Sequence, residues 1–330
     1  MMPETIEPLA LEAGEPMAEA VRKVLRNQYD VMLANEDGSR LGDDIEHVHD
    51  MRVAVRRMRV AFRLFGGYFQ RGSLKRFQKD LRETGRALGA VRDQDVFNRE
   101  AMRYLRRLPK RRRHDLDLLL NNWREQRESA RLALIAYLDG PQYRSFVQEF
   151  GDFVRTPGAC AEVVPFGEPR RYLVRDVLSS TVWQLYETVR AYERALDGAA
   201  LTTLHALRIE TKYVRYALEF FEGVLGPDTP WMIREVIALQ DHLGDIQDAE
   251  VARAILQDFM AQNGPDQGGL SEADLTHITA YLNYRLDVQH NLIATLPEAW
   301  ARVDCARFRR RLASSLFGEP VGEDAVRALQ

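Results

Sequence analysis

The sequence predicts an all-α protein built from two similar helical bundles, with about four main helices in each. Hydrophobic residues recur at helical spacing along most of the 330 residues, and the alternating pattern of β-strands is scarce. The second half of the chain repeats motifs of the first, which indicates an internal duplication. Hydrophobic residues make up 45% of the chain, so each bundle has enough of them to bury a core.

In chain order, the hydrophobic pattern predicts six helices, a break, and six more helices. The first six are expected near residues 16–35, 44–66, 73–92, 94–108, 111–139 and 141–155. The segment 156–170, TPGACAEVVPFGEPR, is rich in Pro and Gly and is expected to be a linker. The last six are expected near 171–197, 201–224, 229–244, 247–263, 271–296 and 298–316, with loops at 225–230 and 263–269. The predicted domains are residues 16–155 and 171–317, and the residues after Phe317 are expected to be disordered.

The repeat is clearest in two pairs of segments. HDMRVAVRRMRVAFRLF at 49–65 returns as HALRIETKYVRYALEFF at 205–221, an offset of 205 − 49 = 156. LGAVRDQDV at 88–96 returns as LGDIQDAEV at 243–251, an offset of 243 − 88 = 155. Because this period is as long as a domain, it predicts a pair of related domains rather than a solenoid.

The net charge of −3 conceals two oppositely charged regions. Residues 49–113 hold 20 Lys and Arg against 6 Asp and Glu, a balance of 20 − 6 = +14. Residues 217–275 hold 2 against 12, a balance of 2 − 12 = −10. This asymmetry predicts a focused basic surface that the average charge does not reveal.

The segment 49–65 carries five arginines but only one acid, Asp50. Its basic residues recur every three or four positions and therefore form one stripe on a helix, about 21 Å long at 1.5 Å per residue. A helix that paired its charges internally would place acids three or four residues from each arginine. We therefore expect the stripe to bind an anion, with pairing to the acidic second half as the alternative. The candidate anion-binding residues here and in the related stripes are His49, Arg52, Arg56, Arg57, Arg59, Arg63, Lys75, Lys79, Arg82, Arg86, His205, Arg208, Lys212 and Arg215, and the basic run continues through Arg103, Arg106, Arg107 and 110–113.

These motifs resemble those of the CHAD family, the histidine-containing α-helical domain. The pattern H-x-x-R-[VI]-x-x-[RK]-x-x-R occurs twice, at 49–59 and 205–215, and each copy precedes an L-G-x-[VI]-x-D motif, at 88–93 and 243–248. The resemblance covers residues 16–317 and implies two pseudo-symmetric four-helix bundles around a basic cavity that binds inorganic polyphosphate. Family members are often fused to a CYTH domain, whose E-x-E-x-K mark does not occur in this sequence.

Two further sets of residues have two possible roles. His49 and His205 each begin a basic stripe, so each is either a structural residue near a helix start or a phosphate ligand whose charge depends on pH. Four acids in the L-G motifs are expected to hold arginines in place rather than to bind catalytic Mg²⁺: Asp93, Asp95, Asp245 and Asp248. No cysteine cage, P-loop or nucleophile–base pair is evident, so no metal, cofactor or catalytic residue is predicted.

The sequence as a whole predicts a non-enzymatic protein that binds polyphosphate. No apolar run is long enough for a transmembrane helix or a signal peptide, so a cytoplasmic location at polyphosphate granules is expected. Three alternatives stay open: a metal-dependent polyphosphatase or triphosphatase, a nucleic-acid-binding module, and a scaffold for an acidic protein surface. Nucleic acid is the less favoured partner, because the aromatic residues Phe62 and Phe65 fall on the apolar face of the first stripe's helix rather than beside the arginines.

Overall fold

The computed structural model describes residues 11–165, 167–264 and 269–318. Within these ranges the chain forms twelve α-helices, three short 3-10 helices and two isolated β-bridges, with no strand. The predicted all-α fold class is therefore confirmed. The disorder expected after Phe317 falls on residues 319–330, which lie outside the described residues.

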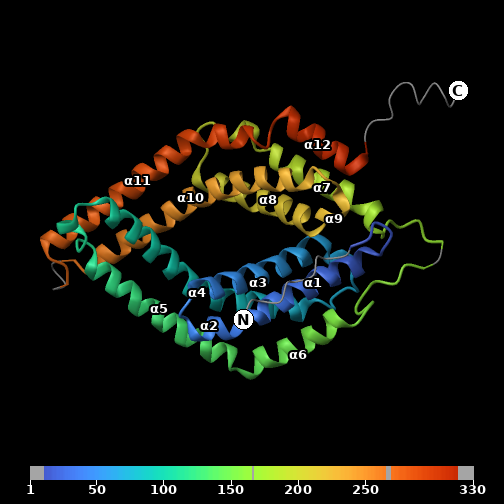
Figure 1. Ribbon diagram of the computed structural model, residues 1–330, viewed down its shortest axis with the longest axis horizontal. Coiled ribbons are helices and arrows are strands. Elements are labelled where there is room, and N and C mark those ends of the chain that lie inside the picture. Colours follow the sequence, from blue (N-terminus) through green and yellow to red (C-terminus); the bar gives the residue numbers. More distant parts are fainter. Residues whose placement is uncertain (1–10, 166, 265–268, 319–330) are drawn as a thin grey trace.

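The helices of the first half form one layer of the molecule, coloured blue to green in Figure 1. Asp44 caps the start of α3, where its side chain accepts a hydrogen bond from the backbone N–H of Glu46 at 2.9 Å. Pro141 opens α6, at a position where its missing N–H would have no helical partner anyway. The bounds are α1 Met17–Ala34, α2 Glu36–Leu41, α3 Ile45–Phe65, α4 Lys75–Arg107, α5 Asp117–Leu138 and α6 Pro141–Arg155.

The helices of the second half form the other layer, coloured yellow-green to red in Figure 1. Ser271 and Asp274 form a reciprocal capping box that fixes the start of α11. Within this layer α8 packs between α7 and α10, and α10 packs along α11. The bounds are α7 Val174–Arg190, α8 Leu201–Phe220, α9 Glu222–Leu225, α10 Thr229–Gln262, α11 Glu272–Ala301 and α12 Ala306–Phe317.

Two helices are longer than the sequence pattern predicts. The expected breaks at 92–94 and 244–247 are wrong, because α4 and α10 run without interruption for 33 and 34 residues. Each contains the glycine of its L-G motif, Gly89 or Gly244. A glycine inside a helix costs only about 1 kcal/mol relative to alanine. Packing against other helices stabilises both long helices: α4 packs against α3 and α5, and α10 packs against α8 and α11.

The break expected between 296 and 298 is also wrong. Pro297 lies inside α11, which continues to Ala301. Proline removes one backbone hydrogen bond, but Leu296 and Trp300 on either side are buried and hold the last turn against the core. The short helices α2 and α9 were not predicted, because neither is long enough to show a periodic pattern.

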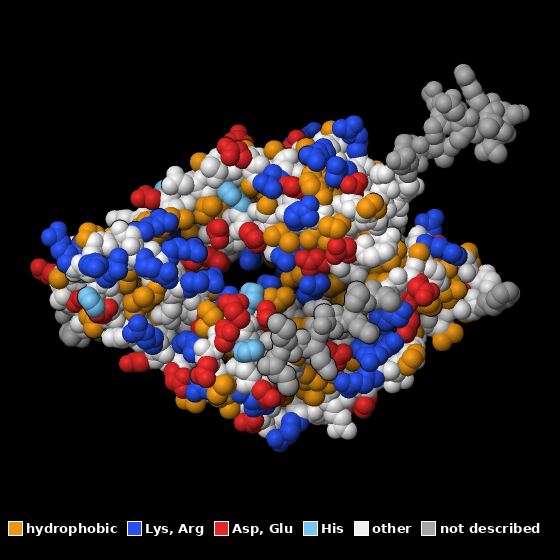
Figure 2. All heavy atoms as spheres, in the orientation of Figure 1, with side chains coloured by type: hydrophobic (Ala, Val, Ile, Leu, Met, Phe, Trp, Pro, Cys, Tyr) orange, Lys and Arg blue, Asp and Glu red, His pale blue; other side chains and the backbone are white. Residues whose placement is uncertain are grey.

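Two clusters of buried hydrophobic residues join the layers, and each cluster takes residues from both halves of the chain. In the larger cluster, the rings of Phe65 and Phe221 lie 5.4 Å apart. In the smaller one, Tyr104 of α4 and Tyr281 of α11 lie 5.0 Å apart. The layers thus meet at both ends, and Figure 2 shows a hollow between those ends. The duplication and the boundaries at 156–170 remain predictions.

Candidate functional site: two joined cationic cavities

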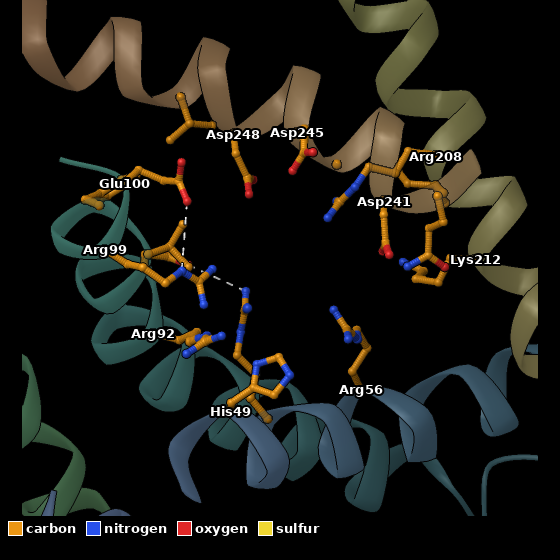
Figure 3. A pocket seen from close by; sticks show the side chains of 18 of the residues that line it. His49, Arg56, Arg92, Arg99, Glu100, Arg208, Lys212, Asp241, Asp245 and Asp248 are labelled. Atoms are coloured by element: carbon orange, nitrogen blue, oxygen red, sulfur yellow. Dashed lines mark ion pairs between the residues drawn. The ribbon is translucent and has the colours of Figure 1, made fainter. Parts of the chain in front are cut away.

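A cavity of about 740 Å³ lies between α3 and α4 of one layer and α8 and α10 of the other. Figure 3 shows cationic side chains entering it from α3, α4 and α8, and carboxylates entering it from α10. The lining has seven Lys or Arg side chains and five carboxylates, a balance of 7 − 5 = +2 without the histidine. These charged residues and the histidine are His49, Arg52, Arg56, Arg92, Asp93, Arg99, Glu100, Arg103, Arg208, Lys212, Asp241, Asp245 and Asp248.

A second cavity, of about 440 Å³, adjoins the first and shares Arg56 and Lys212 with it. Five cations line this second cavity, and its lining contains no carboxylate. The complete lining is Arg56, Arg59, Val60, Arg63, Gln78, Arg82, Lys212 and Tyr213. The stripe on α3 therefore passes from the first cavity into the second, as one continuous row of cations along a single helix.

Several of these cations have no partner among the described residues. No hydrogen bond or ion pair joins Arg56, Arg59 or Arg63 to another described side chain, and the same holds for Lys212. The Nε atoms of Arg56 and Arg208 are buried without a hydrogen-bond partner. Because an unmatched buried donor costs about 1–3 kcal/mol, these groups are poised to donate to an anion that enters from solvent.

Burial and neighbouring charges also disfavour the charged form of Lys212. Burial, and after it the guanidinium groups of Arg56, Arg208 and Arg59 in that order of importance, lower the pKa of its ammonium to about 8. Burial likewise lowers the pKa of Arg52, against the opposing effect of Asp93. A polyanion in the cavity would relieve this repulsion, since it would supply the negative charge that the cations lack.

The glycines of the two L-G motifs make room for arginines. A methyl group placed on Gly89 would lie 3.7 Å from Nε of Arg52, and one on Gly244 would lie 3.4 Å from Nε of Arg208. Both glycines therefore face a guanidinium of the neighbouring helix, α3 in one half and α8 in the other. At both glycines, the close approach is between a helix backbone and an arginine side chain.

The predicted supporting acids occupy three different environments. Asp93 lies 3.7 Å from Arg52, within ion-pair distance but too far for a hydrogen bond, so its supporting role stays a prediction. Asp95 lies outside the cavity, where it binds Arg127 of α5 at 2.6 Å. Asp248 faces the first cavity from α10, and burial raises the pKa of its carboxyl group while Arg208 opposes the change. Asp245 lines the same wall.

Other predicted anion-binding residues lie elsewhere. Arg57 and Arg215 both contact Glu219, at 3.1 and 2.6 Å; the Arg57 contact joins α3 to α8, whereas the Arg215 contact lies within α8. His205 is exposed, with Nδ1 3.0 Å from the side-chain oxygen of Gln247, whereas His49 lines the first cavity. Neither cavity includes Lys75, Lys79 or Arg86: Lys75 lines a separate surface pocket, Lys79 lies 3.9 Å from Glu83, and Arg86 is exposed on α4.

Three arginines of the first cavity were not among the predicted anion-binding residues: Arg92, Arg99 and Arg103, of which only Arg103 was named in the basic run. Arg92 is the last residue of the helix expected at 73–92, and Arg99 and Arg103 lie beyond the break that the sequence pattern wrongly placed near residue 93. Arg92 is buried, and its Nη1 atom has no hydrogen-bond partner. Continuing the spacing of the basic stripe through an unbroken helix would have pointed to this part of α4.

The fold and the cavities define an all-α protein with a recessed cationic surface. The chain belongs to the CHAD domain family, whose model matches residues 23–257. Two solved structures are similar to it with a TM-score of 0.67: the CHAD domain from the plant Ricinus communis, and PptA from Streptomyces chartreusis. The first is 24% identical and aligns over 94% of this chain and 96% of its own; the second is 14% identical and aligns over 87% and 99%. No curated protein matches the chain by sequence.

Two observations on the described residues bear on the remaining alternatives. None of the described helices combines the length and the apolar character needed to cross a membrane. In the same part of the chain, no three or more His, Cys, Asp or Glu side chains are grouped so that they could hold a metal ion.

Proposed function

We propose that the protein binds inorganic polyphosphate in the two joined cavities. The observation that carries the proposal is the second cavity, where five cations meet without a carboxylate. Polyphosphate supplies one negative charge at each internal phosphate and needs donors spaced along a path. Arginine suits this ligand, because its planar guanidinium can donate two parallel hydrogen bonds to one phosphate.

Polyphosphate fits the lining better than single-stranded nucleic acid does. Proteins that hold single strands usually provide aromatic rings on which the bases stack. The aromatic residues of the two cavities are Phe97 and Tyr213. Phe97 packs against Trp123 in the smaller core, with ring centroids 5.8 Å apart, and the ammonium of Lys212 lies 5.3 Å from the ring centre of Tyr213. Neither ring is left free for a base, so the ligand recognised is a phosphate chain.

The function is proposed to be binding without hydrolysis. Polyphosphate hydrolysis by metal ions needs carboxylates that hold the metal against the phosphates. The carboxylates of α10, Asp241, Asp245 and Asp248, form one wall of the first cavity, and these acids would repel the polymer toward α3 and α8. The protein would therefore co-localise with polyphosphate in the cell and associate with polyphosphate granules.

The decisive experiment compares two matched pairs of substitutions. Replacing Arg56 and Arg59 with Gln removes two cations of the carboxylate-free cavity, whereas Arg124→Gln with Arg144→Gln removes two exposed cations of α5 and α6. At roughly 1.5 kcal/mol for each charge-assisted contact, the first pair should weaken polyphosphate binding about 100-fold. The control pair should change the dissociation constant less than threefold. Equal losses in both pairs would show that only net charge matters.

Two further measurements separate the alternatives. Excess RNA should fail to displace long-chain polyphosphate from the purified protein, and displacement at stoichiometric RNA would favour a nucleic-acid-binding function. Incubation with Mg²⁺ or Mn²⁺ should leave the length of the polymer unchanged on a gel. Metal-dependent shortening that is lost in Asp248→Asn would make the protein a polyphosphatase.

A further inference from the structure

A second cluster of cations lies at the end of α4, outside both cavities. We call it the basic tip and define it as Arg106, Lys110, Arg111 and Arg113. All four side chains are exposed, and none has a hydrogen bond or an ion pair with a described residue. Figure 2 shows Lys and Arg side chains gathered over the end of the molecule where α4 turns into α5, and continuing from there toward the central hollow.

The backbone of the tip is held in place by the neighbours of these four residues. Arg112 binds Asp115 at 2.8 Å, and the guanidinium of Arg107 lies 5.3 Å from the ring centre of Tyr284 on α11. Beneath the turn, Leu105 and Leu116 are buried in the smaller core. The tip therefore presents four unpaired cations on a fixed support, although like charges at such spacing repel one another.

The basic tip is continuous with the first cavity along α4. Arg99 and Arg103 line that cavity, and Arg106 follows Arg103 by less than one helical turn. From Arg92, inside the cavity, to Arg106 the helix rises about 21 Å at 1.5 Å per residue. A flexible polyanion that leaves the cavity along α4 thus meets cations at short intervals until the helix ends.

We propose that the basic tip is a second binding site for the same polyphosphate chain, which leaves the first cavity along α4 and is held again at the tip. The proposal rests on the proposed function, since it requires polyphosphate in the cavities. Binding at two linked places raises the overall affinity only for a ligand that reaches both. The tip therefore makes the protein select long polyphosphate chains over short ones, whereas the cavities alone accept either.

The test is a variant of the full-length protein in which all four tip residues are replaced by Gln. Its control carries Gln at four exposed cations that also lack ion pairs and lie outside α4: Arg144, Arg171, Arg194 and Arg234. Binding of long-chain polyphosphate and of tripolyphosphate is measured by competition, at several salt concentrations. Thermal unfolding of both variants should match that of the wild type, because the replaced side chains are exposed and make no hydrogen bond, ion pair or ring contact with described residues.

The tip variant should bind long-chain polyphosphate about tenfold or more weakly, because it loses the second of two linked sites. Its slope of log K against log salt should fall by about 3, from four lost contacts at about 0.7 each. Its affinity for tripolyphosphate should equal that of the wild type, and the control should match the wild type for both ligands.

Several results would overturn the proposal. One is an unchanged affinity of the tip variant for long-chain polyphosphate. Another is a loss of affinity for tripolyphosphate as large as the loss for the long chain, which would mean that the tip acts only through the long-range electrostatic potential of the protein. If the wild type binds RNA or anionic lipid vesicles and the tip variant loses only that binding, the tip serves a different polyanion. If the wild type binds neither phosphate ligand, the proposed function fails first and this inference fails with it.

Discussion

Proton uptake at Lys212 offers a direct test of whether the phosphate chain enters the junction of the two cavities. Burial and three arginines hold the pKa of this ammonium at about 8 in the free protein. A bound polyanion would raise that pKa toward the ordinary value of 10.5. Restoring the ordinary value, a rise of 10.5 − 8 = 2.5, would contribute about 3.4 kcal/mol to binding at 1.36 kcal/mol for each pH unit.

The sign of the pH dependence follows from this direction. The pKa of Lys212 is higher in the complex than in the free protein. Its contribution to the free energy of binding is therefore fully present below about pH 8 and is lost as the pH rises through the pKa of the complex. If the pKa of Lys212 in the complex reaches 10.5, binding should take up about 0.1 proton at pH 7 and about 0.75 proton at pH 8.5. Internal phosphates of a long chain do not titrate in this range.

The assay is isothermal titration calorimetry with long-chain polyphosphate at pH 7 and pH 8.5, in buffers of different ionisation enthalpy. Lys212→Arg keeps the charge and should abolish the uptake, while Lys79→Arg at the exposed Lys79 should leave it unchanged. No uptake by the wild type at pH 8.5, or an uptake that persists in Lys212→Arg, would refute the placement of the polymer at this junction.

Three further outcomes are expected. Gly244→Ala should weaken polyphosphate binding a few-fold, because the new methyl group lies 3.4 Å from Nε of Arg208 and displaces the guanidinium; unchanged binding would contradict that role. Arg127→Gln should lower the free energy of unfolding by about 2 kcal/mol, because it leaves the buried carboxylate of Asp95 without its partner. Arg124→Gln, on the same helix, should lower the free energy of unfolding by less than about 0.5 kcal/mol. If chemical denaturation gives the same loss for both variants, the buried pair of Arg127 and Asp95 does not stabilise the fold. Finally, the affinity for polyphosphate should fall as salt is added. The slope of log K against log salt should be at least about 3.5 in magnitude, from five phosphate contacts at about 0.7 each. An affinity that stays constant from about 50 to 500 mM salt would exclude an electrostatic site.

The sequence by itself determined the helical class and the principal basic stripe. Hydrophobic spacing identified most helices, because a helix that packs on one side must repeat its apolar residues every three or four positions. The same spacing placed five basic residues on one face of α3, and the structure puts all five in the two cavities. The scarcity of acids near Arg56, Arg59 and Arg63 in the sequence agrees with the structure, in which none of the three has a hydrogen bond or an ion pair with another described side chain.

Helix ends were predicted less well than helix faces. Breaks were expected near residue 93 and at Pro297, but α4 and α11 run through both positions. A local propensity of a few kcal/mol is outweighed when the flanking turns are buried against other helices, and sequence alone does not show which turns are buried. Two arginines of the first cavity, Arg99 and Arg103, lie beyond the break wrongly expected in α4.

Only the tertiary structure decided which cations remain unpaired. Arg57 and Arg59 are two residues apart on one helix, yet Arg57 meets Glu219 of the other half while Arg59 faces a cavity. His49 and His205 match in sequence, yet one lines the cavity and the other is exposed. Helical periodicity fixes the angle at which a side chain leaves its own helix, but the packing of α3 against α8 and α10 determines what that side chain meets.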